Sequence, residues 1–310
     1  MSHTSSQELL VRQRVSALVR ELPGARAGDV NAIHQARVAT RRLREALPVL
    51  ASGSKARKLE RTARRLTRAL GPVRELDVAL EMLDGLTKAG EAPPAAIDRL
   101  RQLILDERHN LHTEAAVRIE RCDVERMRRR AVAGVRRELA TGSPVTGAGR
   151  SALAWRRAAR RADRLRAAIE NAASIYLPDR LHKVRIAVKK LRYTMEITRQ
   201  AGGTRAWRPA GNPRSIRSVA GQLAVLKRAQ DLLGRMHDLE ILIARTRAVQ
   251  SSPSSPNLRL SGDFDVLVRR LETECRQLHG HYMASRSQLL DICDRVIVAA
   301  DRASQRASAA

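Results

Sequence analysis

The sequence predicts an all-α protein built from two similar halves, and three observations lead to this fold class. Apolar residues recur at intervals of three and four through most of the 310 residues, which is the spacing of amphipathic helices. No segment shows the alternation of apolar and polar residues that is typical of a strand. Two motifs each occur twice in the same order, which indicates an internal duplication.

Segments rich in Gly, Pro or Ser divide the helical pattern into about ten helices. These expected loops are 21–29, 89–95, 141–149, 202–215 and 250–262. Because the loop at 141–149 lies near the middle, we expect one domain at 5–300 that consists of a half at 5–140 and a half at 150–300. A flexible C-terminal tail is expected at 301–310, where the sequence is rich in alanine and serine.

The first repeated motif is IHQARVATRRLRE at 33–45, which pairs with LHKVRIAVKKLRY at 181–193. The second is RRLTRALGPVRELDV at 64–78, which pairs with KRAQDLLGRMHDLEI at 227–241. The longer loop at 202–215 accounts for the wider spacing of the motifs in the second half. A duplication is the simplest explanation, because chance repeats of one motif seldom bring a second motif in the same order.

The first motif predicts two helices that each have one cationic face. At about 100° per residue, one half of each helix surface holds the basic residues and the other half holds apolar ones. The basic residues are His34, Arg37, Arg41, Arg42 and Arg44 in the first copy and His182, Arg185, Lys189 and Arg192 in the second. The apolar residues are Ala36, Ala39, Leu43, Ala46, Leu47 and Leu50 in the first copy and Ala187, Leu191 and Met195 in the second.

The cationic faces contain no acid between 34 and 44 or between 182 and 192. Ordinary solvated helix faces mix acids with bases and gain stability from their ion pairs. A face of like charges repels itself unless an anion neutralises it. We therefore expect both faces to bind an anion.

Two further helical segments, 55–68 and 155–166, are also rich in arginine. If they line the same groove as the repeated helices, the positive field there increases. The additional residues are Lys58, Arg61, Arg64, Arg65, Arg68, Arg157, Arg160, Arg164 and Lys227. Simple surface solubility explains these residues equally well.

The overall charge predicts a polyanionic partner. Lys and Arg number 59 against 32 acids, which gives a net charge of +27. Aromatic residues make up only 2% of the chain, and this disfavours single-stranded nucleic acids, which stack their bases on aromatic rings. No apolar run reaches the ~18 residues that cross a bilayer, so no membrane insertion is expected. With no signal peptide and no CxxC pair among three cysteines, the expected location is the cytoplasm.

The two histidines at the head of the cationic faces are interpreted as phosphate contacts. A phosphoacceptor role is disfavoured because Val38 and Ile186 stand where phosphotransfer domains place a small residue. Cys275 and His279 lie four residues apart, but two ligands do not make a metal site, so neither metal nor cofactor is expected. Phosphate-loop, GxSxG and HExxH motifs are absent from the sequence, and no enzyme activity is expected.

The two motif pairs, in this order over 5–300, resemble the CHAD domain, the conserved histidine α-helical domain. The resemblance implies two similar helical bundles about a pseudo-twofold axis, with a basic central groove or pore that binds inorganic polyphosphate. It assigns phosphate contacts to His34, Arg37, Arg41, Arg44, His182, Arg185, Lys189 and Arg192, and we add their neighbours Arg42, Lys190 and Tyr193.

The resemblance also implies a role for the chain. We expect a stand-alone, non-catalytic binder located on polyphosphate granules, where granule-associated proteins are further partners. Sequence-nonspecific binding of nucleic acid in duplex grooves is the alternative. An enzyme that cleaves polyphosphate or transfers its phosphates is a weaker alternative, because no paired carboxylates at a recognisable spacing would hold Mg²⁺.

Overall fold

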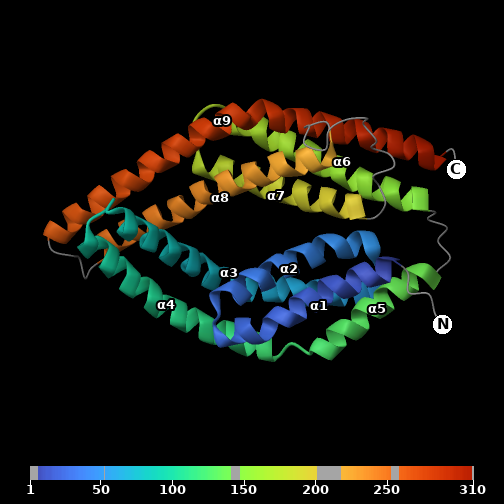
Figure 1. Ribbon diagram of the computed structural model, residues 1–310, viewed down its shortest axis with the longest axis horizontal. Helices are drawn as coiled ribbons and strands as arrows, with labels where there is room; N and C mark the ends of the chain where they lie inside the picture. The colour runs from blue at the N-terminus through green and yellow to red at the C-terminus, as the bar shows by residue number, and fades with distance from the viewer. Residues whose placement is uncertain (1–5, 52, 141–146, 201–217, 253–257, 309–310) are drawn as a thin grey trace. The chain divides into compact units, whose positions relative to one another are not determined.

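The computed structural model describes residues 6–51, 53–140, 147–200, 218–252 and 258–308. Within these ranges the chain forms nine α-helices and no strand, so the predicted all-α class is confirmed (Figure 1). The helices are α1 (Ser6–Ala27), α2 (Val30–Leu50), α3 (Gly53–Ala89), α4 (Pro94–Glu120), α5 (Val124–Ala140), α6 (Gly147–Ala172), α7 (Pro178–Gln200), α8 (Val219–Gln250) and α9 (Leu258–Ser308).

The first expected loop, 21–29, is shorter than predicted because α1 continues through Pro23. Gly28 follows with φ of +89°, a left-handed conformation that favours glycine. Asp29 then caps α2, since its carboxylate accepts a hydrogen bond from the backbone N–H of Ala32 at 2.6 Å. The chain therefore enters the first repeated motif through a tight capped turn.

The other expected loops agree with the structure to different degrees. The loop expected at 89–95 is present but spans only 90–93, and Pro94 opens the next helix, where its missing N–H costs nothing. α9 begins inside the loop expected at 250–262, which is therefore shorter. Two expected loops lie wholly or mostly outside the described residues, at 141–149 and 202–215.

The chain divides into two compact units, each containing two stretches of sequence. Unit 1 consists of Met1–Ser143 and Ile241–Glu272, and unit 2 of Pro144–Glu240 and Thr273–Ala310. The halves expected at 5–140 and 150–300 are continuous segments and do not coincide with these units. The reason is helix length: α8 has 32 residues, α9 has 51, and each contributes one end to unit 1 and the other to unit 2. Gly, Pro and Ser mark helix ends, whereas these unit boundaries fall inside helices.

The prediction of a flexible tail at 301–310 does not hold for most of this segment. Residues 301–308 continue α9, and the side chain of Ala303 is only 4% exposed. The last two residues lie outside the described part of the chain. Composition alone suggested a tail, but small side chains also allow a helix to pack closely.

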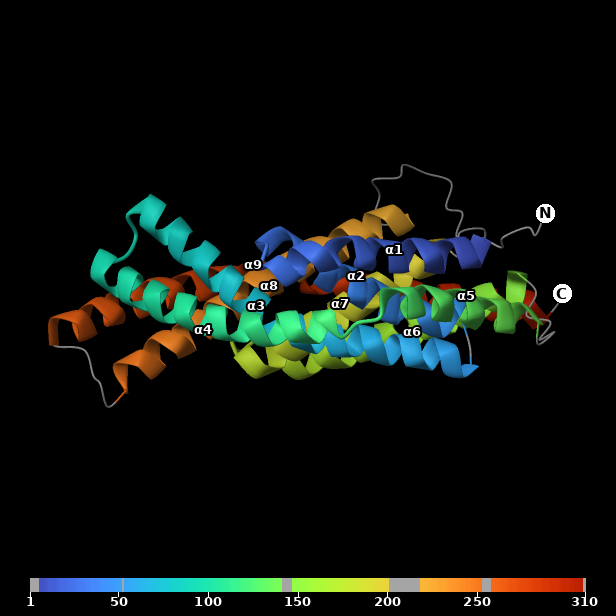
Figure 2. The same cartoon turned by 90° about the horizontal axis from the view of Figure 1, so that it is seen from below.

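Unit 1 is built around the N-terminal helices. α1 packs against α2 and α5, and α3 packs against α2, α4 and α5. In both views α1 and α2 lie side by side (Figures 1 and 2). Leu18, Ile33, Leu43 and Leu70 are fully buried in these packed helices. Each such side chain stabilises the fold by about 1.5 to 3 kcal/mol through removal of apolar surface from water.

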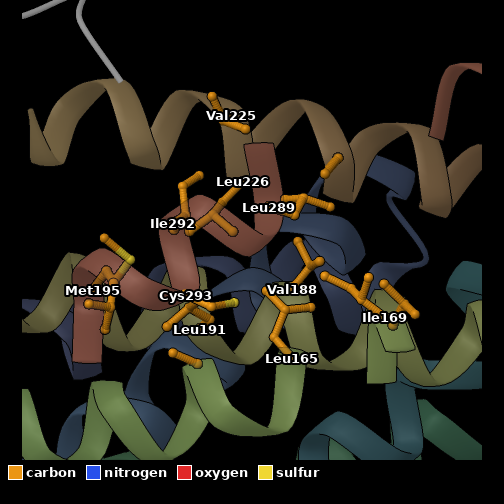
Figure 3. Close-up of a cluster of buried hydrophobic side chains, with 14 of the residues drawn as sticks. Leu165, Ile169, Val188, Leu191, Met195, Val225, Leu226, Leu289, Ile292 and Cys293 are labelled. Carbon is orange, nitrogen blue, oxygen red and sulfur yellow. The ribbon is translucent and has the colours of Figure 1, made fainter. Parts of the chain in front are cut away.

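Unit 2 has its own apolar core, drawn from α6, α7, α8 and α9 (Figure 3). Leu165 from α6, Leu191 from α7, Leu226 from α8 and Ile292 from α9 are all 0% exposed. The core fixes which side of α7 faces inward, and the cationic side of α7 faces away from it. Within the described residues, no helix is both long and apolar enough to span a membrane.

Candidate anion-binding site

The two sides of α2 match the predicted division into an apolar and a basic face. Ile33, Ala36, Leu43 and Ala46 are 0% exposed, so the apolar side is buried in unit 1. The basic residues of the opposite side are half-buried: His34, Arg37, Arg41, Arg42 and Arg44. Half-buried cations feel a lower dielectric than fully solvated ones, which strengthens their attraction for an anion.

Arg37 anchors the basic face of α2 on α3. Its Nη1 donates hydrogen bonds to the carbonyl oxygens of Leu70, at 3.1 Å, and of Gly71. A Cβ atom at Gly71 would lie 3.4 Å from Nη1, so glycine lets the guanidinium approach the helix backbone closely. The carbonyl of Arg37 in turn accepts a hydrogen bond from Nε of Arg41 at 3.3 Å.

We call His34, Arg37, Arg41 and Arg44 on α2, together with Arg74 on α3, the first basic cluster. Burial lowers the pKa of His34, and the nearby positive charges of Arg74 and Arg41 lower it further. The imidazole is therefore neutral at neutral pH. A bound anion would offset those charges and raise its pKa.

Two arginines of the first basic cluster differ in how their charge is balanced. Arg74 forms a two-pronged ion pair with Glu81, with contacts of 2.9 and 3.3 Å. Arg44 has no acidic partner among the described residues, and its buried Nε has no hydrogen-bond partner there. Arg42 likewise buries an Nε without a partner in the described ranges. Unsatisfied buried donors are costly, so both arginines gain if an acceptor arrives.

We call His182, Arg185, Lys189 and Arg192 on α7, together with His237 on α8, the second basic cluster. The Nδ1 atoms of His182 and His237 lie 3.2 Å apart, and their ring centroids lie 4.4 Å apart. A hydrogen bond at this distance requires one Nδ1 to donate and the other to accept. The donating ring then has an unprotonated Nε2. A single proton added at this Nε2 atom leaves the hydrogen bond between the two rings intact.

Burial and neighbouring cations keep both of these histidines neutral. Burial lowers the pKa of His182, followed by the charges of Arg185 and Lys189. The pKa of His237 is lowered to about 4, first by burial and then by Arg185. The second basic cluster therefore holds two imidazoles that take up protons at a lower pH than a free histidine does, and added negative charge would favour their protonation.

The arginine three residues after each histidine lies against the glycine of the second motif. A Cβ atom at Gly234 would lie 4.0 Å from Nε of Arg185, just as one at Gly71 would contact Arg37. Asp238 adds an ion pair to Arg185 at 4.0 Å. The same contact between two motifs in both copies is what an internal duplication predicts.

Arg192 is more strongly held than its counterpart Arg44. Its Nε donates to Gln230 at 3.0 Å, and its Nη1 pairs with Glu196 on the same helix. Its guanidinium also lies 4.5 Å from the ring centroid of Tyr193. Tyr193 is only 5% exposed, so it supports Arg192 from the interior and is a poor direct contact for an anion. Lys190, by contrast, is exposed.

The additional basic residues lie in several different surroundings. Arg65 and Arg68 line a cavity with residues of α4 and α5, and this lining includes neither Arg37 nor the residues that Arg37 contacts. Arg64 pairs with Glu60 at 2.9 Å, and Lys227 pairs with Asp231 at 3.0 Å, which reduces their net charge. The rest lie exposed on α3 or α6, apart from the half-buried Arg157: Lys58, Arg61, Arg160 and Arg164.

Sequence reasoning missed Arg74 and His237 as members of the clusters. Both follow the glycine of the second motif by three residues, and both precede an acid, Glu75 or Asp238. A basic residue at equivalent positions of the two copies was the available signal. It points to function only once α3 and α8 are known to lie beside the basic helices.

The cysteine and histidine pair considered for metal binding lies in a packed environment. Cys275 is 1% exposed, and burial raises its pKa to about 11. The Tyr176 hydroxyl nearby donates to Glu240, and its ring packs edge-on against His279 at 5.3 Å. Across the described ranges, no three His, Cys, Asp or Glu side chains converge as metal ligands would.

The fold and the two clusters define a class: an all-helical protein that presents clustered cations on two equivalent helices. The sequence model of the CHAD domain matches residues 9–247, and the chain therefore belongs to the CHAD domain family. No curated protein matches the chain.

Two solved structures share this fold. The crystal structure of the CHAD domain from the plant Ricinus communis is 19% identical, with a TM-score of 0.62, over 91% of this chain and 90% of that one. PptA from Streptomyces chartreusis is 15% identical, with a TM-score of 0.59, over 90% of this chain and 97% of that one. At these identities the likeness concerns the fold alone.

Proposed function

We propose that this chain binds inorganic polyphosphate, without cleaving it, through the first and second basic clusters. The observation that carries the proposal is the pair of equivalent helices, each with a histidine and at least three further cations on one half-buried face. In each copy, one arginine of this face lies against a neighbouring helix. Membership of the CHAD family supports the proposal, because the resemblance to this family implies polyphosphate binding.

The chemistry of the clusters suits a linear phosphate polymer. Polyphosphate carries about one negative charge per phosphate and has no bases to read, so guanidinium forks and ammonium groups suffice to bind it. Arg41, Arg44 and Lys189 are the proposed direct contacts, and Arg42 and Lys190 flank them. Arg37, Arg185 and Arg192 contribute charge while they hold the helices in place. Two clusters on one chain also give a long polymer two points of attachment, which raises its apparent affinity.

The histidines make binding depend on protons. His34, His182 and His237 have lowered pKa values in the free protein because burial and nearby cations oppose a further charge. Bound phosphates would offset those cations and raise the three pKa values. Binding would then take up protons, and its affinity would rise as the pH falls.

We further infer a cellular role in which binding attaches the chain, or proteins that associate with it, to polyphosphate granules in the cytoplasm. A non-catalytic chain with a strong positive charge suits such an anchor. The test is fluorescence microscopy of the tagged chain in cells that do and do not make polyphosphate. Identical distributions in the two would contradict this role.

Calorimetry tests the binding itself. At about 0.15 M salt, we expect long polyphosphate to bind much more tightly than ATP or free phosphate, and the affinity to fall steeply with added salt as condensed ions are released. Equal affinities for the three ligands would rule out the proposal. Displacement of polyphosphate by duplex DNA at equal charge concentration would favour a nucleic-acid binder instead. Release of phosphate by the pure protein with added Mg²⁺ would show an enzyme.

A further inference from the structure

Unit 1 contains a second basic feature that shares no residue with the first basic cluster. It is a cavity of about 520 Å³ lined by residues of α3, by the end of α4 and by the start of α5. Figure 2 shows α4 joined to α5 by a short connection, which supplies part of this lining. Six arginines surround the cavity: Arg65, Arg68, Arg118, Arg121, Arg126 and Arg130. We call it the arginine pocket.

The base of the arginine pocket differs from its walls. Leu66 and Met127 are each 1% exposed, so apolar side chains close the cavity on the side of the core. Cys122 and Thr62 are half-buried beside them. The arginine side chains are exposed or half-buried and remain within reach of a ligand. A buried apolar base with exposed cationic walls is suited to a ligand that enters from solvent.

The charges around the arginine pocket are not balanced by the protein. Asp123 is the one acid in the lining, and its Oδ1 accepts a hydrogen bond from the backbone N–H of Arg126 at 2.7 Å. Arg118 pairs with Glu114 at 3.3 Å. Within the part of the chain that the structure describes, the other five arginines form no ion pair with an acid. Such a cluster repels itself, and the positive end of the α5 dipole adds to the repulsion.

We propose that the arginine pocket binds a compact anion with several phosphate groups, such as a short oligophosphate. Five unpaired guanidinium groups require several negative charges in a small volume, and guanidinium forks bind phosphate oxygens in pairs. The volume falls within the range of small-molecule sites. The lining has no aromatic side chain to stack on a base, so recognition rests on the phosphates.

Cys122 provides a built-in reporter of occupancy. It lines the arginine pocket, whereas the other two cysteines, Cys275 and Cys293, are 1% and 0% exposed. A thiol reagent therefore modifies Cys122 first. A phosphate ligand would cover the thiol and offset the charge of Arg65, which favours the thiolate. Both effects slow the modification.

The experiment measures the rate of Cys122 modification with tripolyphosphate as the probe, at about 0.15 M ionic strength. We expect saturable slowing by about fivefold or more, and little slowing by citrate at the same ionic strength. Arg121→Ala with Arg126→Ala removes two exposed arginines at helix ends and should weaken this protection by at least about tenfold. Circular dichroism checks that the variant keeps its helices.

A second variant separates this proposal from the binding of polyphosphate by the first basic cluster. Arg41→Ala with Arg44→Ala alters that cluster and should leave the protection of Cys122 by tripolyphosphate in place. Four results would each overturn the proposal: protection that never saturates, equal protection by citrate, protection that survives Arg121→Ala with Arg126→Ala, or protection by long polyphosphate only.

Discussion

The two basic clusters share their packing and differ in their charge. In both, an arginine of the basic helix lies against a glycine of the neighbouring helix, Arg37 against Gly71 and Arg185 against Gly234. Three residues beyond the glycine, the first basic cluster has the permanent charge of Arg74. The second has an imidazole there, with its pKa lowered to about 4. Packing is therefore the constant feature, and the protonation behaviour is the variable one.

The far ends of the basic helices show a second difference. Arg44 has no acidic partner among the described residues, whereas Arg192 is held by Glu196, Gln230 and the ring of Tyr193. An arginine with several partners stabilises the fold but must be drawn away from them before it binds a ligand. The comparison separates cations available for binding from cations used for structure.

The substitution Arg192→Ala has the largest expected effect, and it tests this distinction between binding cations and structural cations. The variant should lower the free energy of unfolding by roughly 1.5 to 3 kcal/mol, because it loses charge-assisted hydrogen bonds to Glu196 and Gln230. Urea unfolding of the purified chain measures the change. Arg44→Ala is the matched control, and its free energy of unfolding should change by less than about 0.5 kcal/mol. Equal losses in the two variants would remove the distinction.

A smaller effect is expected from exchanging the residues that differ between the clusters. His237→Arg gives the second basic cluster the permanent charge of the first. In the natural chain, affinity for polyphosphate should rise by up to about tenfold from about pH 7.5 to about pH 5, because bound phosphates raise the histidine pKa values and protons are taken up. The variant should show a shallower dependence, since one titrating group is gone. The reverse change, Arg74→His, should steepen it.

Protonation of the same histidines also affects the free protein. The pKa of His237 falls from 6.5 to about 4 on folding, so the unfolded chain binds the proton first. Stability is therefore lost as the pH falls through this window. Calorimetric melting of His237→Arg should show a weaker loss than the natural chain. If binding and melting of His237→Arg depended on pH as they do in the natural chain, His237 would not titrate as described.

The smallest effect concerns the two glycines. Gly234→Ala should stabilise α8 by about 0.5 to 1 kcal/mol, because alanine favours helix and the added Cβ meets Arg185 only at van der Waals distance. Gly71→Ala should gain less, since its Cβ would lie 3.4 Å from the nitrogen of Arg37 that bonds the helix carbonyls. Thermal melting of the two variants measures the difference. A larger gain for Gly71→Ala would show that Arg37 is not held as described.

The periodicity of apolar residues was sufficient to predict which face of a single helix is buried. Burial of Ile33, Ala36 and Leu43, with the arginines between them half-buried, follows from a repeat of 3.6 residues that a single helix imposes. On α2 the predicted apolar residues from Ala36 to Leu47 are buried, and on α7 Leu191 and Met195 are buried while Ala187 is half-buried.

Features that depend on neighbouring helices could not be predicted from the periodicity of apolar residues. Arg74 and His237 join the clusters only because α3 and α8 pack beside the basic helices. The placement of Arg65 and Arg68 in the arginine pocket depends in the same way on α4 and α5. Glu196 lies four residues after Arg192, just past the acid-free segment of α7. Their ion pair could therefore have been predicted from the sequence.

The central claim, that half-buried cations of both clusters bind polyphosphate, has one direct test. Arg41→Ala with Lys189→Ala removes one cation from each cluster, and Arg259→Ala with Arg302→Ala removes two exposed arginines outside both. Affinity for long polyphosphate at about 0.15 M salt should fall by more than about tenfold in the first variant and by less than about twofold in the second. Equal losses in the two variants would contradict the claim and show that only net charge matters.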